Sequence, residues 1–99
     1  MKLRFEWDQA KAEGNRCKHQ ISFELATRVF LDPYALTVQD RIEHGEYRWQ
    51  TLGCIEGILI LLVAHTVHEE RHGNEIIRII SARRADARER SRYEQARSL

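Results

Sequence analysis

The sequence predicts an α+β fold, in which a mainly antiparallel sheet is covered by two helices near the N-terminus and one at the C-terminus. Three observations predict it. The first residues alternate between apolar and polar side chains, two segments with helical spacing follow before Pro33, and the later apolar residues repeat with a period of two. The expected order is therefore strand, helix, helix, four strands, helix. With 99 residues the chain has the length of one domain, so residues 1–99 are expected to fold as a single unit.

The N-terminal third is predicted to hold one strand and two helices. Residues 2–7 alternate as a half-buried strand does, and Asp8 is suited to cap a helix that ends near His19. Ser22 is a second N-cap candidate. The helix after it carries a broad apolar stripe and ends before Pro33, because the residue preceding a proline avoids helical geometry.

After Pro33 the pattern becomes that of four consecutive strands joined as an antiparallel meander. Their apolar centres are residues 36–38, 47–51, 58–64 and 77–79. Glycines mark the predicted turns, at Gly45, Gly53, Gly57 and Gly73. The polar stretch 68–72 is expected to be an exposed hairpin loop. Residues 85–97 lack glycine and proline, which predicts a C-terminal helix.

Composition excludes several classes of protein. The chain opens without an apolar signal segment, and its longest apolar run, residues 58–64, is far shorter than the roughly 18 residues that cross a bilayer. We therefore expect a cytoplasmic protein that does not contact a membrane. Cys17 and Cys54 are expected to be free thiols, because a lone disulfide is unusual in a reducing compartment.

Charge is unevenly distributed along the chain. Residues 1–70 hold eight basic and eleven acidic residues, a net charge of −3, whereas residues 71–99 hold eight basic and four acidic residues, a net charge of +4. All eight basic residues of the second segment are arginines, whose planar fork of donors matches a phosphate group. The C-terminal end is therefore a candidate anion-binding region.

An ordered set of short motifs covers nearly the whole chain. The set is Phe5-Glu6-Trp7-Asp8 with Lys11, Asn15, Lys18-His19, Ser22-Phe23-Glu24, Val29-Phe30-Leu31-Asp32, Glu46, Arg48, Gly53, Arg78-Ile79-Ile80-Ser81-Ala82-Arg83-Arg84-Ala85, Glu89-Arg90 and Tyr93. Each motif alone is weak, but their order and separation are specific. In these residues the sequence resembles the BrnT family of type II toxins.

The resemblance implies a RelE-like fold and an endoribonuclease that inhibits translation by cleaving RNA without a metal or other cofactor. It also implies a partner antitoxin that resembles BrnA and carries a ribbon-helix-helix element. Promoter DNA would then be bound only through the complex of toxin and antitoxin.

Metal-free RNA cleavage by the 2′-hydroxyl needs a base, cations that neutralise the phosphate, and an acid for the leaving oxygen. Arg48, Arg78 and Arg83 come from neighbouring predicted strands, so we expect them to converge on one face of the sheet as phosphate ligands. The alternative is that they are solvated strand residues. Arg78 interrupts a run of isoleucines, which favours a function for it.

The base is harder to assign from the sequence. Glu46 shares a strand face with Arg48, so it is either the base or an ion-pair partner of that arginine. Lys18 is a further catalytic candidate, although a cation at the end of a helix also has a plain electrostatic explanation.

The C-terminal helix supplies candidate RNA contacts. Arg84, Arg88 and Arg92 recur at four-residue spacing and are expected to bind RNA backbone or to lie under the antitoxin. Tyr93 either stacks on a base or anchors this helix to the core. A second class of function also fits the charge, namely a non-catalytic interaction module whose arginine-rich helix binds an acidic partner or DNA.

Three histidines follow the apolar strand, at positions 65, 68 and 72. His65 and His68 have opposite strand parity and no cysteine accompanies them, so no metal site is predicted. A histidine at the end of a strand is more often hydrogen-bonded within the structure than catalytic. The sequence alone leaves the roles of these histidines open.

Overall fold

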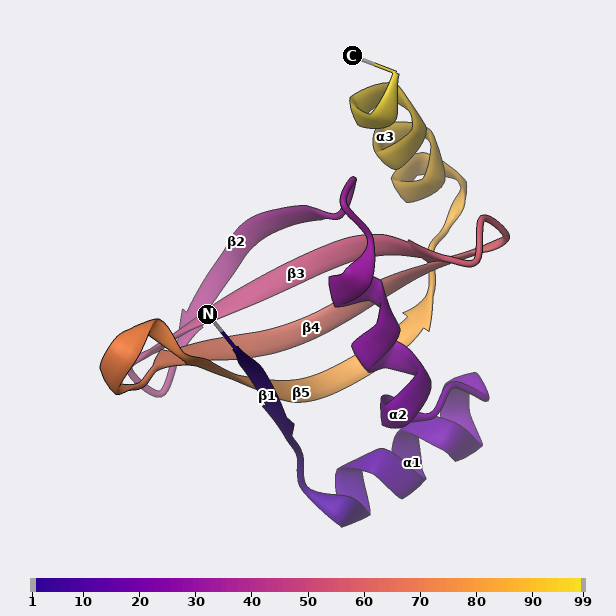
Figure 1. The fold of residues 1–99 in the computed structure, drawn as a ribbon. Coiled ribbons are helices and arrows are strands. Elements are labelled where there is room, and N and C mark those ends of the chain that lie inside the picture. The colour runs from indigo at the N-terminus through magenta and orange to yellow at the C-terminus, as the bar shows by residue number, and fades with distance from the viewer. Residues whose placement is uncertain (1, 99) are drawn as a thin grey trace.

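The computed structural model describes residues 2–98 and has five strands in one sheet (Figure 1). In chain order the elements are β1 Leu3–Glu6, α1 Gln9–His19, α2 Phe23–Ala26, the 3-10 helix η1 Thr27–Leu31, β2 Leu36–Glu43, β3 Glu46–Ile55, β4 Leu59–Glu69, η2 Arg71–Gly73, β5 Glu75–Arg84 and α3 Ala87–Arg97. The strand order is β1-β5-β4-β3-β2. Strand β1 runs parallel to β5 and every other pair is antiparallel, which confirms the predicted α+β class and mainly antiparallel sheet.

One face of the sheet is covered by α1, α2 and η1, and we call it the helix-covered face. Alternate residues of β4 and β5 point into it, among them Leu61, Val63, Ile77 and Ile79. The buried apolar residues on this face form the larger of the two hydrophobic clusters. They are Ala12, Ile21, Phe23, Ala26, Val29, Ile55, Leu61, Val63, Ile77, Ile79 and Ala82.

Helix α1 is fixed at both ends by local hydrogen bonds and at its middle by a distant one. The Asp8 carboxylate accepts from the backbone N–H groups of Ala10 and Lys11, as an N-cap does. The buried Asn15 amide donates to the carbonyls of Ile21 and Ala82 and accepts from the Ala82 N–H at 3.0 Å. Strand β1 pairs with β5 only as far as Arg78, so it does not reach Ala82. The Asn15 side chain makes the hydrogen bonds to the Ala82 backbone that a neighbouring strand would otherwise make.

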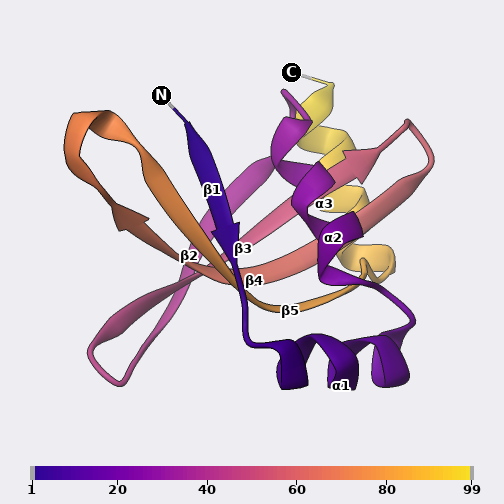
Figure 2. The same ribbon diagram turned by 60° about the horizontal axis from the view of Figure 1, so that its bottom comes forward.

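The opposite face is covered at one end only, by α3 (Figure 2). Leu52, Leu62, Ala85 and Tyr93 form a small buried cluster there. Asp86 caps α3 in a capping box with Glu89, in which each side chain accepts from the other residue's backbone N–H. The rest of this face, which we call the open face, carries polar side chains with isoleucines of β5 between them, and none of α1, α2, η1 and α3 covers it.

Tyr93 joins α3 to the segment before β2. Its ring is 1% exposed and its hydroxyl donates a hydrogen bond to Asp32. Asp32 also accepts from the backbone N–H groups of Cys54 and Tyr34, at 2.8 and 2.9 Å. Burial alone would raise the pKa of Asp32, but these three hydrogen bonds outweigh it and hold the pKa below its ordinary value.

Several predicted boundaries were wrong. The second helix is α-helical only over Phe23–Ala26 and then tightens into η1. Gly53 is not a turn residue: it lies within β3, where a Cβ atom would sit 2.6 Å from the Cβ of Val29. Glycine is needed there because η1 packs directly on the strand.

The C-terminal boundary and the predicted loop also differ. The last helix begins at Ala87, because Asp86 is its N-cap and Ala85 is still bound to the sheet through a hydrogen bond to the Ile60 carbonyl. His68 and Glu69 belong to β4 rather than to a loop, since the hairpin to β5 turns within residues 70–74. Both cysteines are free thiols. Within residues 2–98, no helix has the length and apolar character to span a membrane.

Candidate functional site

The sheet divides into two arms at one end. Strands β3 and β4 are paired from Ile55 and Leu59 as far as Trp49 and His65, and then separate. Beyond this point the β2–β3 hairpin forms the first arm, residues 40–48, and the β4–β5 hairpin forms the second arm, residues 66–78. Figure 2 shows the two hairpins diverging, which leaves a cleft between them.

Two adjoining pockets occupy this region. The first, of about 440 Å³, fills the cleft between the arms and is lined by Gly45, Glu46, Tyr47, Trp49, Thr66, Val67, His68 and Glu69. The second, of about 180 Å³, lies on the open face and is lined by Glu6, Glu46, Thr66, His68, Ile76 and Arg78. Glu46, Thr66 and His68 line both, so the two pockets lie next to each other.

Strand register explains why chemically active side chains meet in the smaller pocket. Arg78 lies opposite Thr66 on one side and opposite Glu6 on the other, so these three side chains share the open face. His68 is one diagonal step from Arg78, which places their backbones about 7–8 Å apart. Glu46 comes from the other arm. A carboxylate, an imidazole and a guanidinium group therefore line one small pocket.

Arg78 is free to bind an anion. It lies on the open face, is exposed, and is flanked on its strand by the half-buried Ile76 and Ile80. No ion pair among residues 2–98 involves Arg78, although Glu6 lies beside it in register. A guanidinium held on a strand with its donors unused is well suited to a phosphate oxygen.

Arg48 lies two residues from Glu46 on β3, lines neither pocket, and has an unsatisfied hydrogen-bond donor. Its side chain is only 19% exposed, and its Nε lies 3.9 Å from Glu43, too far for a hydrogen bond. The Nε atom is buried and has no hydrogen-bond partner among the described residues. Because an unpaired buried donor is costly, an anion that reached Arg48 would gain binding free energy from satisfying it.

The sequence also matches a known family, described as the ribonuclease toxin BrnT of type II toxin-antitoxin systems, over residues 7–89. The chain belongs to the BrnT family of ribonuclease toxins. No curated protein matches the sequence. The crystal structure of the ribonuclease toxin BrnT from Brucella abortus matches with a TM-score of 0.63 and 23% identity, covering 87% of this chain and 99% of that one. This structural likeness shows a shared fold.

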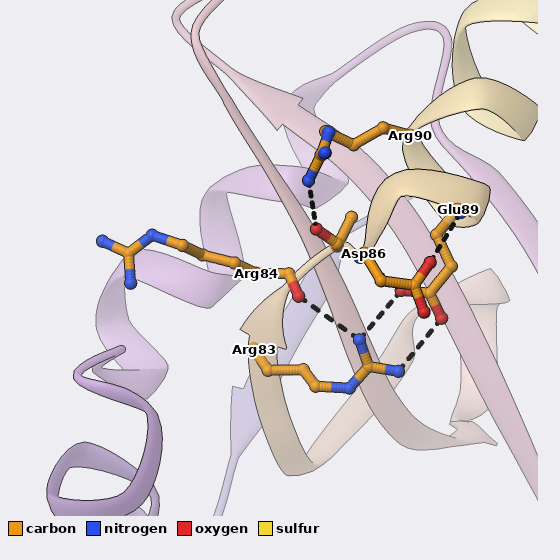
Figure 3. A network of polar contacts seen from close by, with 6 residues as sticks. Arg83, Arg84, Asp86, Glu89 and Arg90 are labelled. Atoms are coloured by element: carbon orange, nitrogen blue, oxygen red, sulfur yellow. Dashed lines mark hydrogen bonds and ion pairs between the residues drawn. The ribbon is translucent and has the colours of Figure 1, made fainter.

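Arg83, predicted to join Arg48 and Arg78 in the BrnT site, lies on the same face of the sheet but at the other end. It is opposite Leu62, whereas Arg78 is opposite Thr66. Its guanidinium donates two hydrogen bonds to Glu89, at 2.8 and 3.0 Å, and a third to the Arg84 carbonyl (Figure 3). The hydrogen bonds to Glu89 raise the pKa of Arg83. Arg83 therefore connects β5 to the start of α3.

Lys18 is also apart from the cleft. It is exposed in the last turn of α1, and α1 packs on the helix-covered face, whereas Glu46, Arg48 and Arg78 belong to the open face. The second part of the prediction for Glu46, an ion pair with Arg48, does not form, since Arg48 is nearer to Glu43.

The predicted arginine stripe is interrupted. Arg84 belongs to β5, and Figure 3 shows its side chain pointing away from Arg83 and Glu89, so it is not in line with Arg88 and Arg92 on α3. All three arginines are exposed. Tyr93 has the role of a core anchor, and its buried ring has no free face on which a base could stack.

His68 is the residue of this pocket that sequence reasoning missed. The sequence offers one signal: His68 is two residues from Thr66, so in a strand the two share a face, opposite Ile76 and Arg78. The polar composition of residues 68–72 obscured this signal. A turn centred on Gly73, which has a positive φ of 76°, would have indicated the register.

His65 has a structural role. Its Nδ1 faces the Thr66 carbonyl, which can only accept, so Nδ1 carries the proton and Nε2 accepts from the Thr51 hydroxyl at 2.7 Å. Thr51 in turn accepts from Thr37. Burial under Phe30 lowers the pKa of His65, against the effect of its backbone hydrogen bond. Within residues 2–98, no group of three or more potential metal ligands occurs.

Proposed function

We propose that this BrnT-family toxin cleaves RNA in the open-face pocket by metal-independent attack of a ribose 2′-hydroxyl on the adjacent phosphate. The observation that carries the proposal is that Glu46, His68 and Arg78 line one pocket although they come from three different strands. These groups supply the base, acid and cation that the reaction needs.

Each residue has one step in this scheme. Glu46 takes the proton of the 2′-hydroxyl, and the oxygen forms a bond to phosphorus. Arg78, together with Arg48 from the same face of the sheet, binds the non-bridging phosphate oxygens as negative charge builds on them. His68 donates a proton to the 5′-oxygen as its bond to phosphorus breaks. The products are a 2′,3′-cyclic phosphate and a 5′-hydroxyl end.

The remaining predicted residues have supporting roles in the proposal. Arg83 and Tyr93 hold α3 against the sheet, through Glu89 and Asp32. The exposed Arg84, Arg88 and Arg92 are candidates for contacts with RNA backbone or with the antitoxin. Lys18 has no part in the reaction, because α1 lies behind the sheet.

Membership of the BrnT family supports a second part of the proposal, which is that an antitoxin binds this protein. A type II system pairs its toxin with an antitoxin, and we infer a BrnA-like ribbon-helix-helix partner that silences this toxin in the cytoplasm. Promoter DNA is then bound by the complex, through the antitoxin. We also propose, from the sequence resemblance, that this α+β fold with its mainly antiparallel sheet is RelE-like.

The test is cleavage of labelled single-stranded RNA by the purified protein in excess chelator. We expect activity to persist, with 2′,3′-cyclic phosphate ends. Arg78→Ala should lower the rate about 10²-fold or more, and Glu46→Gln about 10²–10⁴-fold. Arg16→Ala, which removes an exposed arginine of α1, is the matched control and should leave the rate unchanged.

Two results would overturn the proposal. One is a rate that survives Arg78→Ala in a variant whose thermal unfolding matches the parent. The other is an RNA that the protein binds but does not cut under any of these conditions, which would favour the non-catalytic interaction module.

A further inference from the structure

The cleft between the arms has features that the cleavage scheme does not use. The scheme uses Glu46 and His68, but the cleft is also lined by four residues that the scheme leaves out, Tyr47, Trp49, Val67 and Glu69. The pocket volume of about 440 Å³ lies within the roughly 300–1,000 Å³ typical of small-molecule sites. There is room for a ligand the size of one nucleoside.

The walls of the cleft suit an aromatic ring. Tyr47 belongs to the first arm and is 55% exposed, and Trp49, at the base of that arm, is half-buried. Val67 faces them from the second arm. Flat aromatic and apolar walls are how proteins hold unstacked bases of single-stranded RNA.

The polar group in this part of the cleft is an acceptor. Glu69 lies opposite Glu75 in the register of β4 and β5, so two carboxylates face each other across the strands. No ion pair or side-chain hydrogen bond among residues 2–98 involves either carboxylate. Like charges directly opposite are unfavourable, and a ligand rich in N–H donors would relieve this.

We propose that the cleft binds a guanine base, stacked between the arms and hydrogen-bonded to Glu69, and that the toxin cuts RNA on the 3′ side of that guanosine. The inference rests on the proposed function. A carboxylate only accepts hydrogen bonds, and guanine is the RNA base with two adjacent donor groups, N1–H and the N2 amino group, on its Watson–Crick edge. Adenine, cytosine and uracil each place an acceptor beside their donor.

The residues that the two pockets share set the position of the cut. Glu46 lines both pockets, and in the scheme it takes the proton of the attacking 2′-hydroxyl. The nucleoside that owns this hydroxyl therefore lies in the cleft, while its 3′-phosphate lies at Arg78. A guanosine 3′-phosphate end is the expected product after the cyclic phosphate opens.

The test is the binding of 3′-GMP, 3′-AMP, 3′-CMP and 3′-UMP to the full chain, measured by calorimetry and by tryptophan fluorescence. We expect 3′-GMP to bind about ten-fold more tightly than the others. Glu69→Gln should abolish this preference, because its amide presents a donor to one of guanine's donors, and Arg78→Ala should weaken all four nucleotides alike. Glu75→Gln is the matched control: it removes the facing charge and should keep the preference for guanine.

The outcomes separate this inference from the proposed function. A toxin that cuts RNA but binds the four nucleotides equally overturns the guanine site and leaves the cleavage scheme standing. A toxin that prefers 3′-GMP but does not cut RNA overturns the cleavage scheme alone. Binding of L-argininamide in the cleft with no binding of 3′-GMP would contradict the inference and indicate an antitoxin side chain as the occupant.

Discussion

His65 and His68 lie three residues apart on the same strand and have opposite environments. His65 points to the helix-covered face, where it is 1% exposed, packs edge-on against Phe30 and is hydrogen-bonded to Thr51. His68 points to the open face, where it is exposed and lines both pockets. The comparison teaches that the cover of helices, rather than residue type, decides which side chains of this sheet are structural and which are available to a ligand.

The largest difference between the two faces should be in the free energy of unfolding that is lost when a leucine is replaced by alanine. The adjacent leucines of β4 test this. Leu61 is fully buried in the large cluster of the helix-covered face, and Leu62 lies in the small cluster under α3. Within the range of about 2–5 kcal/mol for such changes, Leu61→Ala should fall near the upper end and Leu62→Ala near the lower end. Urea unfolding measures both. Equal losses would show that α3 covers its end of the sheet as tightly as the N-terminal helices cover theirs.

Replacing each histidine by alanine should separate stability from activity. His65→Ala leaves a cavity and removes one of the two hydrogen bonds of the buried Thr51 hydroxyl, and should lower the free energy of unfolding by about 2–3 kcal/mol. His68→Ala should change it by less than about 0.5 kcal/mol while it slows RNA cleavage. Thermal unfolding and the RNA assay measure the two effects. A His68→Ala variant that is strongly destabilised would contradict the comparison.

The contact between β3 and η1 should be intolerant of a single added methyl group. Gly53→Ala would put a Cβ atom 2.6 Å from the Cβ and 2.8 Å from the carbonyl oxygen of Val29. Overpacking of this kind costs about 1–3 kcal/mol, and backbone cannot move aside as a flexible side chain can. Gly14→Ala is the control, because a Cβ there meets no atom within 4 Å. If both variants unfold at the parent's urea concentration, η1 is not packed as described.

The smallest expected effect is the pH dependence of stability, which should differ between the faces. Burial lowers the pKa of His65 below 6.5 in the folded state, so the unfolded chain binds the proton more readily and stability falls as pH falls below 6.5. The hydrogen bonds of Asp32 and Glu89 lower their pKa values below 3.8 and 4.5, so the stability they confer is lost only at lower pH. The slope for one proton cannot exceed about 1.4 kcal/mol per pH unit.

Urea unfolding from pH 8 to pH 3 distinguishes the two groups. His65→Gln should remove the change in stability between pH 6.5 and pH 5, and Asp32→Asn should reduce the change below pH 4.5. A variant without His65 that keeps the upper transition would assign that transition to another residue.

The features that the sequence predicted well are local ones. Asp8 signals the start of α1 through its own side chain, and the alternation of residues 36–38 and 47–51 is enough to predict strands whose pairing is antiparallel. Asp86 and Glu89 form a capping box that is visible in the sequence, and reading it would have placed the start of the last helix correctly.

The features that sequence reasoning missed depend on contacts between distant residues. Gly53 is a glycine because of Val29, which a local pattern cannot reveal. Arg83 and Arg78 look alike in the sequence, but Glu89 accepts hydrogen bonds from Arg83 and not from Arg78. Of the candidate site, the sequence alone indicated Glu46, Arg48 and Arg78. It did not indicate the cleft, because the two arms diverge where the pairing of β3 with β4 stops, beyond Trp49 and His65.

The parallel pairing of β1 with β5 has a consequence for how the open-face pocket forms. Leu3 pairs with Glu75, so β1 cannot join the sheet until more than three quarters of the 99-residue chain has been synthesised. Contacts so distant in sequence carry a high entropic cost of loop closure and form late in folding. Glu6 and Arg78 meet through this same pairing. The open-face pocket, which Glu6 and Arg78 both line, therefore depends on the pairing in the sheet that is most distant in sequence.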